Sequence, residues 1–287
     1  MTKPTLAVIG GSGLYSMPGL QEIQELNLDT PFGKPSAPVV VGKLNGLPLA
    51  FLARHGIGHH ISPSEINYRA NIYALKALGV ERVISISACG SLHDDYAPGH
   101  IVIPDQVFDF SRGRQRTFFT DGIVAHIGVA EPFCGDLSQK LINAVSSCGA
   151  VVHKGGTIIT IEGPRFSTKA ESNVFRSWGM SIIGMTTSPE VFLAREAEMC
   201  YAVMAHVTDY DVWHKSEEPV SVEAVIAVLN QNTQLAQQAI STLVQNLTAK
   251  RDCSCSTALE NAIITNFAMI PPETRQRLDL LVGKYLR

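Results

Sequence analysis

Short apolar runs alternate with segments of helical spacing along most of the chain. Continuous apolar runs of about four to eight residues are typical of buried strands, and apolar residues three and four apart are typical of amphipathic helices. Strands are predicted at 5–9, 39–44, 47–54, 82–88, 101–110, 157–162, 181–185 and 200–207. Helices are predicted at 66–78, 137–145, 222–229 and 272–285. Asn45-Gly46, between two of the predicted strands, is a strong hairpin signal.

This alternation predicts one mixed α/β domain. No repeat, low-complexity tract or long linker divides the 287 residues. The composition shifts only after Leu247, where a polar segment leads to the last predicted helix. We therefore expect a main domain at 1–248 and a helical C-terminal extension at 249–287 that packs on it.

Composition and charge narrow the class of protein. The chain is 45% hydrophobic, 17% charged and carries a formal net charge of −3, so no basic excess indicates a nucleic-acid or membrane-surface partner. No apolar stretch approaches the roughly 18 residues of a membrane span, and the first eleven residues resemble neither a signal peptide nor an anchor. Six cysteines are too few for a secreted disulfide scaffold. We expect a soluble, cytoplasmic, globular protein.

Most of the candidate chemistry lies where a predicted strand ends. The clusters are Gly10–Gly13, Arg54-His55, Ser87–Gly90, Met185–Thr187 and Thr208–Asp211. Because ligands of open α/β sheets bind at strand ends, these clusters are expected to share one pocket.

Two of the clusters are candidates for binding an anion. Gly10–Gly13 can present backbone N–H groups to an anion or can form a simple tight turn. Ser16 stands where a Rossmann fingerprint needs glycine, which disfavours a dinucleotide site. Arg54 offers a fork of donors that matches phosphate, and His55 can add another; the alternative is a surface arginine beside a core histidine. His59 and His60 lack a carboxylate or cysteine at ligand spacing, so we expect no metal here.

Two other segments are candidates for binding a flat heteroaromatic base. Asp209 and Asp211 would point the same way along a continued strand, and buried carboxylates are costly unless they bind something; the alternative is a solvated turn. Phe166 and Ser167 could stack on and hydrogen-bond to a base, or belong to a Gly-Pro turn.

Together these segments resemble the 5′-methylthioadenosine phosphorylases of the purine nucleoside phosphorylase family. The matching motifs, in the family's order, are Ile9–Leu14, Arg54–Gly56, Asn67–Asn71, Ser87–Leu92, Glu162–Ser167, Met185–Thr187 and Thr208–Asp211. The resemblance covers about residues 5–230 and implies a single-domain fold, with a central mixed twisted β-sheet flanked by helices and a helical C-terminal extension.

The reaction implied by the resemblance is phosphorolysis of methylthioadenosine to adenine and 5-methylthioribose 1-phosphate, a step of purine and methionine salvage. Inorganic phosphate is then a co-substrate, and neither a cofactor nor a metal is implied. The implied phosphate-binding residues are Ser12, Arg54, His55, Ser87, Ala88 and Thr186.

The resemblance also assigns residues to the nucleoside. Met185 would lie against the ribose, and Phe166 and Ser167 would flank the base. Cys89 is also implied to be a substrate-binding residue. Asp209, kept protonated by burial beside a second carboxylate, would assist departure at N7. Asp211 would accept a hydrogen bond from the 6-amino group, a contact that disfavours 6-oxopurines. Family members that use 6-oxopurines carry Asn at the matching site.

Two further assignments concern the 5′ end of the nucleoside and the oligomeric state of the protein. By similarity, Val222 would line an apolar methylthio pocket. His126 matches a position that reaches into a neighbouring subunit's pocket, which implies a homo-oligomer, either a trimer or a hexamer built as a dimer of trimers.

Other functions remain open at this point. A 6-aminopurine phosphorylase that also accepts adenosine would share every motif. A hydrolytic nucleosidase would share the fold but would have no need of Arg54 and the hydroxyl set around an anion. A non-catalytic nucleoside-binding protein would not need a complete set of phosphate and base positions.

Cys253-Ser254-Cys255 resembles C-terminal pairs in certain prokaryotic relatives. Two cysteines are too few for a closed zinc site. In a reducing cytoplasm free thiols are the default, and a Cys253–Cys255 disulfide is the alternative. The other four cysteines are interpreted as small core residues.

Overall fold

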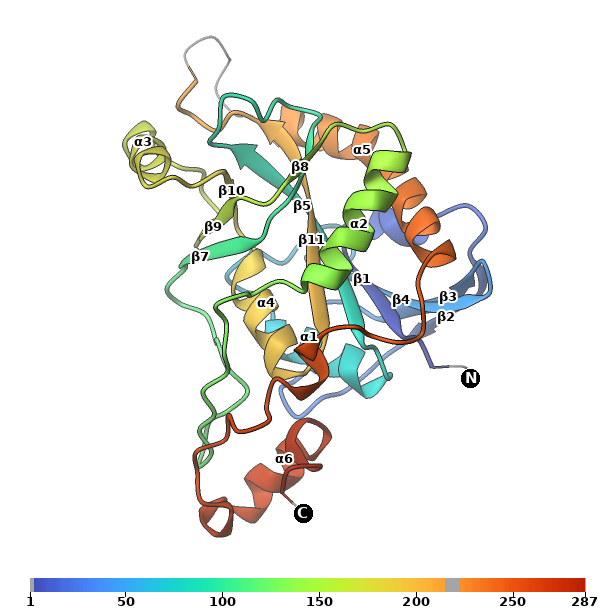
Figure 1. The fold of residues 1–287 in the computed structure, drawn as a ribbon, viewed down its shortest axis with the longest axis vertical. Coiled ribbons are helices and arrows are strands. Elements are labelled where there is room, and N and C mark those ends of the chain that lie inside the picture. The colour runs from blue at the N-terminus through green and yellow to red at the C-terminus, as the bar shows by residue number, and fades with distance from the viewer. Residues whose placement is uncertain (1–2, 215–221, 287) are drawn as a thin grey trace.

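Eleven strands and six α-helices are present in the computed structural model, which describes residues 3–214 and 222–286 (Figure 1). The side chains of residues 12, 15 and 222–232 lie outside the described part. The strands are β1 (Leu6–Gly10), β2 (Gln21–Leu26), β3 (Val39–Leu44), β4 (Leu47–Ala53), β5 (Arg82–Ser91), β6 (Ile101–Ile103), β7 (Gln106–Phe110), β8 (Val152–Lys154), β9 (Thr157–Ile161), β10 (Ile182–Gly184) and β11 (Cys200–Asp209). The helices are α1 (Tyr68–Ala77), α2 (Gly135–Ser147), α3 (Lys169–Ser177), α4 (Thr187–Glu196), α5 (Val222–Gln245) and α6 (Pro272–Val282).

The strands form one mixed sheet that branches at β5. Its main path runs β2-β3-β4-β1-β5-β10-β9-β7, and β11 pairs with both β5 and β6. Nearly all of β5, from Arg82 to Gly90, lies parallel to β11, and its last residues, Gly90 and Ser91, pair antiparallel with β10 on the other side. The long strand β5 therefore places the ends of β10 and β11 next to each other.

Helices cover both faces of the sheet, as Figure 1 shows. Successive residues of β11 point to opposite faces, so Val203 and Ala205 belong to the core with α1 and α4, whereas Ala202 and Met204 belong to the core with α2 and α5. A smaller cluster joins α3 to β9 and β10 through Phe175, outside the two main layers. The α/β fold with a mixed central sheet is thus confirmed.

One predicted strand was wrong. The run 101–110 is two strands, because β6 pairs with β11 and β8 whereas β7 pairs with β9. Pro104, which has no N–H for a ladder, separates them. The other predicted strands and helices are present, and the Asn45-Gly46 hairpin is confirmed with both residues at positive φ.

The sequence pattern did not predict β2, β8, α3 or α4. Strand β2 is a polar edge strand, so it lacks an apolar run. Helix α3 carries a complete capping box between Thr168 and Glu171, a signal that the sequence does contain.

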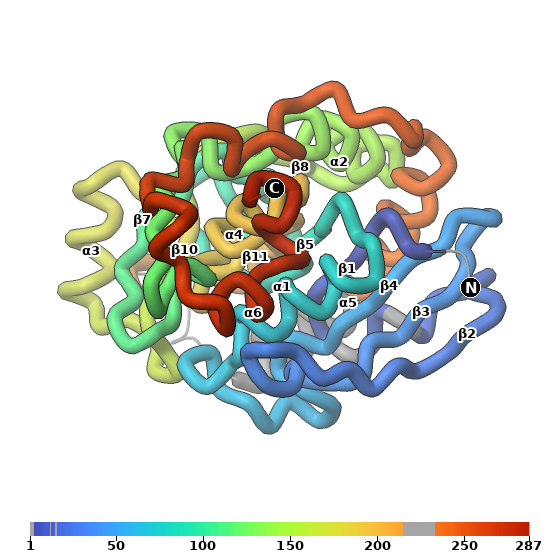
Figure 2. Tube along the Cα trace, turned by 90° about the horizontal axis from the view of Figure 1, so that it is seen from below, coloured from blue at the N-terminus to red at the C-terminus, as the bar shows by residue number. Residues whose placement is uncertain are grey.

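The segment after residue 248 packs on the same core as the sheet. Leu278, Leu281 and Ile270 are buried in the layer that contains α1 and α4. Figure 2 shows this segment crossing the end of the molecule near those helices. The last predicted helix, at 272–285, is present as α6, and two short 3-10 helices precede it.

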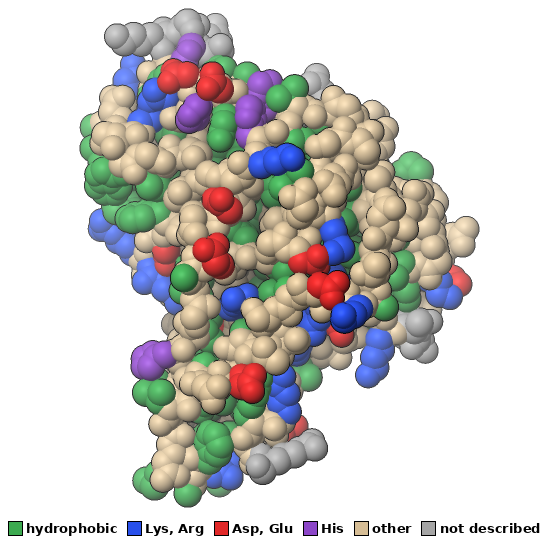
Figure 3. Space-filling view, viewed as in Figure 1, with side chains coloured by type: hydrophobic (Ala, Val, Ile, Leu, Met, Phe, Trp, Pro, Cys, Tyr) green, Lys and Arg blue, Asp and Glu red, His purple; other side chains and the backbone are tan. Residues whose placement is uncertain are grey.

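Acidic and basic side chains are interspersed over the face drawn in Figure 3, in line with the small net charge. Among the described residues, no helix is long and apolar enough to cross a membrane.

Candidate active site

The strand register brings the predicted clusters to the side of the sheet where β1, β4 and β11 have their carboxyl ends. Gly10 pairs with Ala53, and the backbone N–H of Arg54 donates to the Gly10 carbonyl at 3.0 Å. Asp209 and Ile183 both pair with Gly90. A Cβ on Gly90 would lie 3.0 Å from Asp209 Oδ1 and 3.3 Å from Asp211 Cβ, so glycine lets both aspartates approach β5.

Arg54 is buried in a network that joins β4, β5 and α4. Its Nε and Nη2 donate to the two Glu190 carboxylate oxygens at 2.8 and 2.9 Å, and Nη2 also donates to Ser85 Oγ at 2.6 Å. Nη1 donates to the Ile86 carbonyl at 3.2 Å. Burial acts against the charged guanidinium, but Glu190 outweighs it and raises the pKa of Arg54. Glu190 was not predicted, because nothing near it in the chain indicates its partner.

His55 lies beside this network as a neutral ring at pH 7. Burial and the charge of Arg54 lower the pKa of His55 to about 4. Its Nδ1 lies 2.9 Å from the Ile61 carbonyl, and its ring stacks on His59. Because a carbonyl only accepts, Nδ1 carries the hydrogen and Nε2 of the neutral ring is an acceptor.

Asp209 ends β11 and is held through both carboxyl oxygens. The Asp211 N–H donates to Oδ1 at 2.7 Å, and Thr208 Oγ1 lies 2.6 Å from Oδ2. Thr208 Oγ1 also lies 3.2 Å from the Cys89 carbonyl. Burial raises the pKa of Asp209, and the two hydrogen bonds partly offset that rise. Burial and the charge of Asp209 likewise raise the pKa of the Cys89 thiol.

Asp211 has an unsatisfied oxygen beside two unsatisfied hydroxyls. Its Oδ2, Ser167 Oγ and Ser172 Oγ are all buried, and none has a hydrogen-bond partner of normal geometry among the described residues. Burial, with the charge of Asp209, raises the pKa of Asp211, and the two hydroxyls partly offset the rise. Ser172 on α3 was not predicted, although it lies in the capped helix that the motif Glu162–Ser167 leads into. The two hydroxyls therefore lie close to Asp211 without forming a hydrogen bond of normal geometry, an arrangement that leaves all three groups available to a polar ligand.

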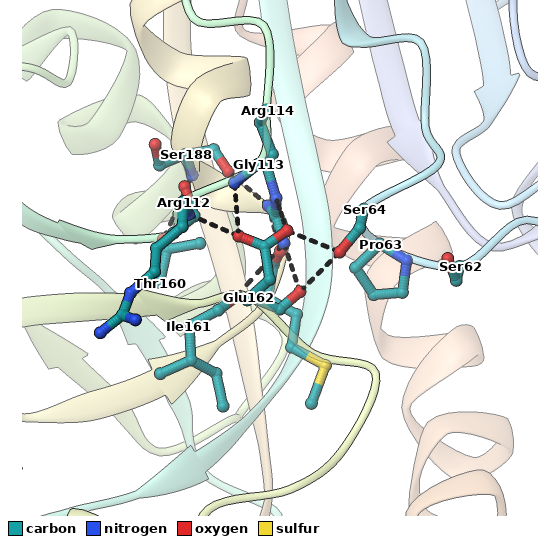
Figure 4. A network of polar contacts seen from close by, with 12 residues as sticks. Ser62, Pro63, Ser64, Arg112, Gly113, Arg114, Thr160, Ile161, Glu162 and Ser188 are labelled. Atoms are coloured by element: carbon teal, nitrogen blue, oxygen red, sulfur yellow. Dashed lines mark hydrogen bonds and ion pairs between the residues drawn. The ribbon is translucent and has the colours of Figure 1, made fainter.

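The turn after β9 is fixed by the network of polar contacts in Figure 4. Buried Arg114 donates to the carbonyls of Glu162, Met185 and Ser188 at 2.6, 2.6 and 2.7 Å. The Glu162 carboxylate accepts from Ser64 Oγ at 2.6 Å. Partial burial acts to raise the pKa of Glu162, but the Arg112 N–H, Ser64 and Arg114 lower it to about 2. Arg114 therefore links the turn to the start of α4. Arg114 was not predicted as a site residue from the sequence.

The same turn lies against Met185 and a cavity. A Cβ on Gly163, whose φ is +66°, would lie 2.6 Å from Met185 Sδ, so the turn and Met185 are in close contact. A cavity of about 350 Å³ is bordered by Ser167, Glu162 and Phe110. Phe166 beside it is exposed.

The remaining predicted residues are placed less uniformly. Ser87 and Ala88 are half-buried on β5. Thr186 is the N-cap of α4, and its hydroxyl makes no capping hydrogen bond. The side chains of Ser12 and Val222 lie outside the described residues.

His126 does not lie near the candidate site of this chain. It is exposed, and its N–H donates to the Ala262 carbonyl at 2.8 Å. In Figure 1 the carboxyl end of β11 lies at the top, whereas the segment that carries His126 runs beside the C-terminal segment at the bottom.

A family model for the phosphorylase superfamily matches residues 5–245. The chain belongs to the phosphorylase superfamily. The S-methyl-5′-thioadenosine phosphorylase of Geobacter sulfurreducens is 54% identical over 285 residues, which cover 99% of this chain and 100% of that one. The protein of the same name from Chloroflexus aurantiacus is 51% identical, with 99% of each chain covered.

Solved structures agree with this assignment. A methylthioadenosine phosphorylase from an Antarctic soil metagenomic library is 44% identical, with a TM-score of 0.94 over 98% of this chain and 99% of that one. The methylthioadenosine phosphorylase of Schistosoma mansoni in complex with adenine is 34% identical, with a TM-score of 0.84 over 90% of this chain and 99% of that one. The resemblance inferred from the motifs is therefore confirmed.

The cysteine predictions hold, but the sequence did not show one feature. Cys134 and Cys200 are buried in the core with α2 and α5, as expected, and Cys253 and Cys255 are free thiols, the expected default. The sulfur atoms of these four cysteines also lie within 4.8 Å of one another. Spacing along the chain could not show this, because more than fifty residues separate Cys200 from Cys253. All six cysteines are free thiols in the structure.

Proposed function

We propose that this superfamily member cleaves 5′-methylthioadenosine with inorganic phosphate, giving adenine and 5-methylthio-α-ribose 1-phosphate. The observation that carries the proposal is that Arg54 and the Asp209–Asp211 pair both stand at carboxyl ends of strands in one sheet. The names and identities of the relatives support the same substrate.

At the phosphate end, Arg54 supplies charge and one remaining donor. Four of its five N–H groups have partners in Glu190, Ser85 and the Ile86 carbonyl, which leaves one Nη1 hydrogen for the anion. His55 Nε2, an acceptor in the neutral ring, suits a protonated phosphate oxygen. The hydroxyls of Ser12, Ser87 and Thr186 and the Ala88 backbone complete the proposed set. Phosphate held under C1′ is both the nucleophile and the electrostatic partner of the oxocarbenium-like ribose.

At the base end, Asp209 is the proposed acid. Thr208 has one hydrogen to share between the Cys89 carbonyl and Asp209 Oδ2. A protonated Asp209 completes this chain, because Thr208 then donates to the carbonyl and accepts from the carboxyl group. Burial favours that protonated form. As the glycosidic bond breaks, the carboxyl proton leaves Thr208 for N7 and the Thr208 hydrogen turns to the resulting carboxylate. The transferred proton neutralises the negative charge that develops on the departing purine.

Asp211 is the proposed reader of the 6-amino group. Its unpartnered Oδ2 can accept from that group, and Ser167 Oγ beside it can bond to the ring edge. A 6-oxo group would place oxygen against oxygen, which is repulsive. The proposal also places Phe166 and Cys89 at the base, Met185 at the ribose and Val222 at the methylthio group.

We further propose a homo-oligomer, a trimer or a hexamer, in the cytoplasm. The single chain exposes Phe108 on β7, Val174 on α3 and Trp178 at the C-cap of α3, and the ring centroids of Phe108 and Trp178 are 5.8 Å apart. Such apolar patches are typical of protein interfaces. A neighbouring copy would also explain a ligand role for His126, which lies far from this chain's own site.

The decisive experiment measures adenine release from methylthioadenosine with and without phosphate. Release is expected only with phosphate, together with one equivalent of the pentose phosphate. An Asp209→Asn preparation, purified in the same way, controls for contaminating host nucleosidase. Equal rates of adenine release by the wild type without phosphate would overturn the proposal in favour of a hydrolytic nucleosidase.

A further inference from the structure

Four cysteines from three parts of the chain meet at the end of β11 that is remote from the candidate site. Cys200 begins β11, Cys134 is the N-cap of α2, and Cys253 and Cys255 follow α5. Their sulfur atoms all lie within 4.8 Å of one another, and Cys200 Sγ is 3.4 Å from Cys253 Sγ. No other group of this kind was found among the described residues.

The arrangement has the dimensions of a tetrahedral thiolate site. Four sulfurs about 2.3 Å from one zinc ion lie about 3.8 Å from one another. Three of the four cysteines are buried and Cys253 is half-buried, so the sulfurs are largely shielded from water. We propose that this Cys134–Cys200–Cys253–Cys255 cluster binds one Zn²⁺ ion.

The surroundings suit the charge of such a site. Four thiolates around a divalent ion carry a net charge of −2. Arg195 Nη1 on α4 donates to Cys255 Sγ at 3.3 Å and brings a positive charge next to the sulfur. Cys134 stands at the N-terminus of the thirteen-residue helix α2, where unpaired backbone N–H groups favour a negative charge.

The segment that carries the two C-terminal cysteines is held in place by other contacts. Arg82 Nη2 donates to the carbonyls of residues 248, 249 and 250 at 3.1, 3.3 and 3.0 Å. Arg251 Nη1 donates to the Glu198 carbonyl at 3.1 Å. Hydrogen bonds from the Arg82 and Arg251 side chains therefore hold the segment that carries Cys253 and Cys255 near the other two cysteines, as a preorganised site requires.

The proposed ion is structural. Four protein ligands leave no open coordination position for a substrate. Nine residue steps of about 3.3 Å separate Cys200 from Asp209, so the ion is about 30 Å from the acid. It would join the C-terminal segment to β11 and α2.

The test is metal analysis of the full-length protein purified without chelator. We expect about one zinc per chain, and near zero in Cys253→Ser and in Cys134→Ser. Cys148→Ser, which changes a cysteine outside the cluster, should keep its zinc. Removing zinc with a chelator should lower the Tm of the wild type, and one equivalent of Zn²⁺ should restore it.

Three results would overturn the proposal, and each is read on the wild type, so none depends on whether a variant folds. The first is metal-free protein with six titratable thiols after denaturation. The second is two titratable thiols, which would mean that the cluster forms two disulfides. The third is iron in place of zinc, seen in the visible spectrum and by metal analysis.

Discussion

Arg54 combines a buried ion pair with the proposed contact to phosphate, so its substitution affects both. Arg54→Ala removes a charge-assisted hydrogen bond worth about 1.5–3 kcal/mol, which predicts a phosphate KM about ten- to a hundredfold higher. It also leaves Glu190 buried and unpaired, which typically costs about 3–5 kcal/mol of stability. Steady-state kinetics and denaturant unfolding measure the two effects.

A double variant separates the two roles. Arg54→Ala with Glu190→Gln removes the orphaned charge, and the glutamine oxygen can still accept from Tyr201, which lies 2.7 Å from the Glu190 carboxylate. Stability should recover in large part, whereas the phosphate KM should stay high. A phosphate KM that returned to the wild-type value would mean that Arg54 acts only through the fold.

The identity of residue 211 should set the choice of base. An Asp211→Asn side chain can turn its NH₂ toward a 6-oxo group. Efficiency should fall on methylthioadenosine and rise on methylthioinosine. Loss of a satisfied buried polar contact is worth about 1–3 kcal/mol, so the ratio of the two kcat/KM values should shift about ten- to a hundredfold.

Asp209→Asn is the matched comparison for this switch. It keeps a donor for N7 but has no transferable proton, so kcat should fall with both bases and their ratio should change little. If the two variants behave alike, the roles assigned to the two carboxylates are wrong.

At the scale of single elements, the sequence predicts what depends on local pattern. The buried strands β1, β5 and β11 are visible as apolar runs, and the hairpin between β3 and β4 follows from Asn45-Gly46. The branch at β5 is not visible, because which strand pairs with which depends on contacts far apart in the chain.

The same distinction applies to the candidate site. Residues at the ends of strands, such as Arg54 and Asp209, can be found from the sequence because the end of a strand is a local feature. Glu190, Arg114 and Ser172 are recognised only through partners that are remote in the sequence or unpaired atoms in space. Strand β11 shows both cases, with Asp209 found at one end and the cysteine cluster missed at the other.

At the scale of the whole molecule, buried titratable groups make stability depend on pH. His206 on β11 is buried, and neither ring nitrogen has a hydrogen-bond partner among the described residues. Burial lowers the pKa of His206 from 6.5 to about 4. The unfolded chain therefore binds a proton between these values that the native state does not, so His206 lowers the free energy of unfolding as the pH falls from about 6.5 to 4.

Glu196 acts in the opposite direction. Burial raises the pKa of Glu196 from 4.5 to about 7, against hydrogen bonds from the Phe118 N–H and the Thr117 hydroxyl. The native state holds a proton there that the unfolded chain has lost, so this contribution is present at low pH and is lost as the pH rises toward 7.

Two variants separate these opposing contributions, each compared with the wild type by denaturant unfolding from pH 7 to 4.5. Relative to His206→Asn, the wild type should lose stability as the pH falls, by up to about 3 kcal/mol for a shift of this size. Relative to Glu196→Gln, the wild type should gain stability over the same range. Since both comparisons share one native fold and one wild type, opposite slopes can arise only from the two groups themselves. Slopes of the same sign, or no slope with His206→Asn, would contradict the assigned pKa of the corresponding group.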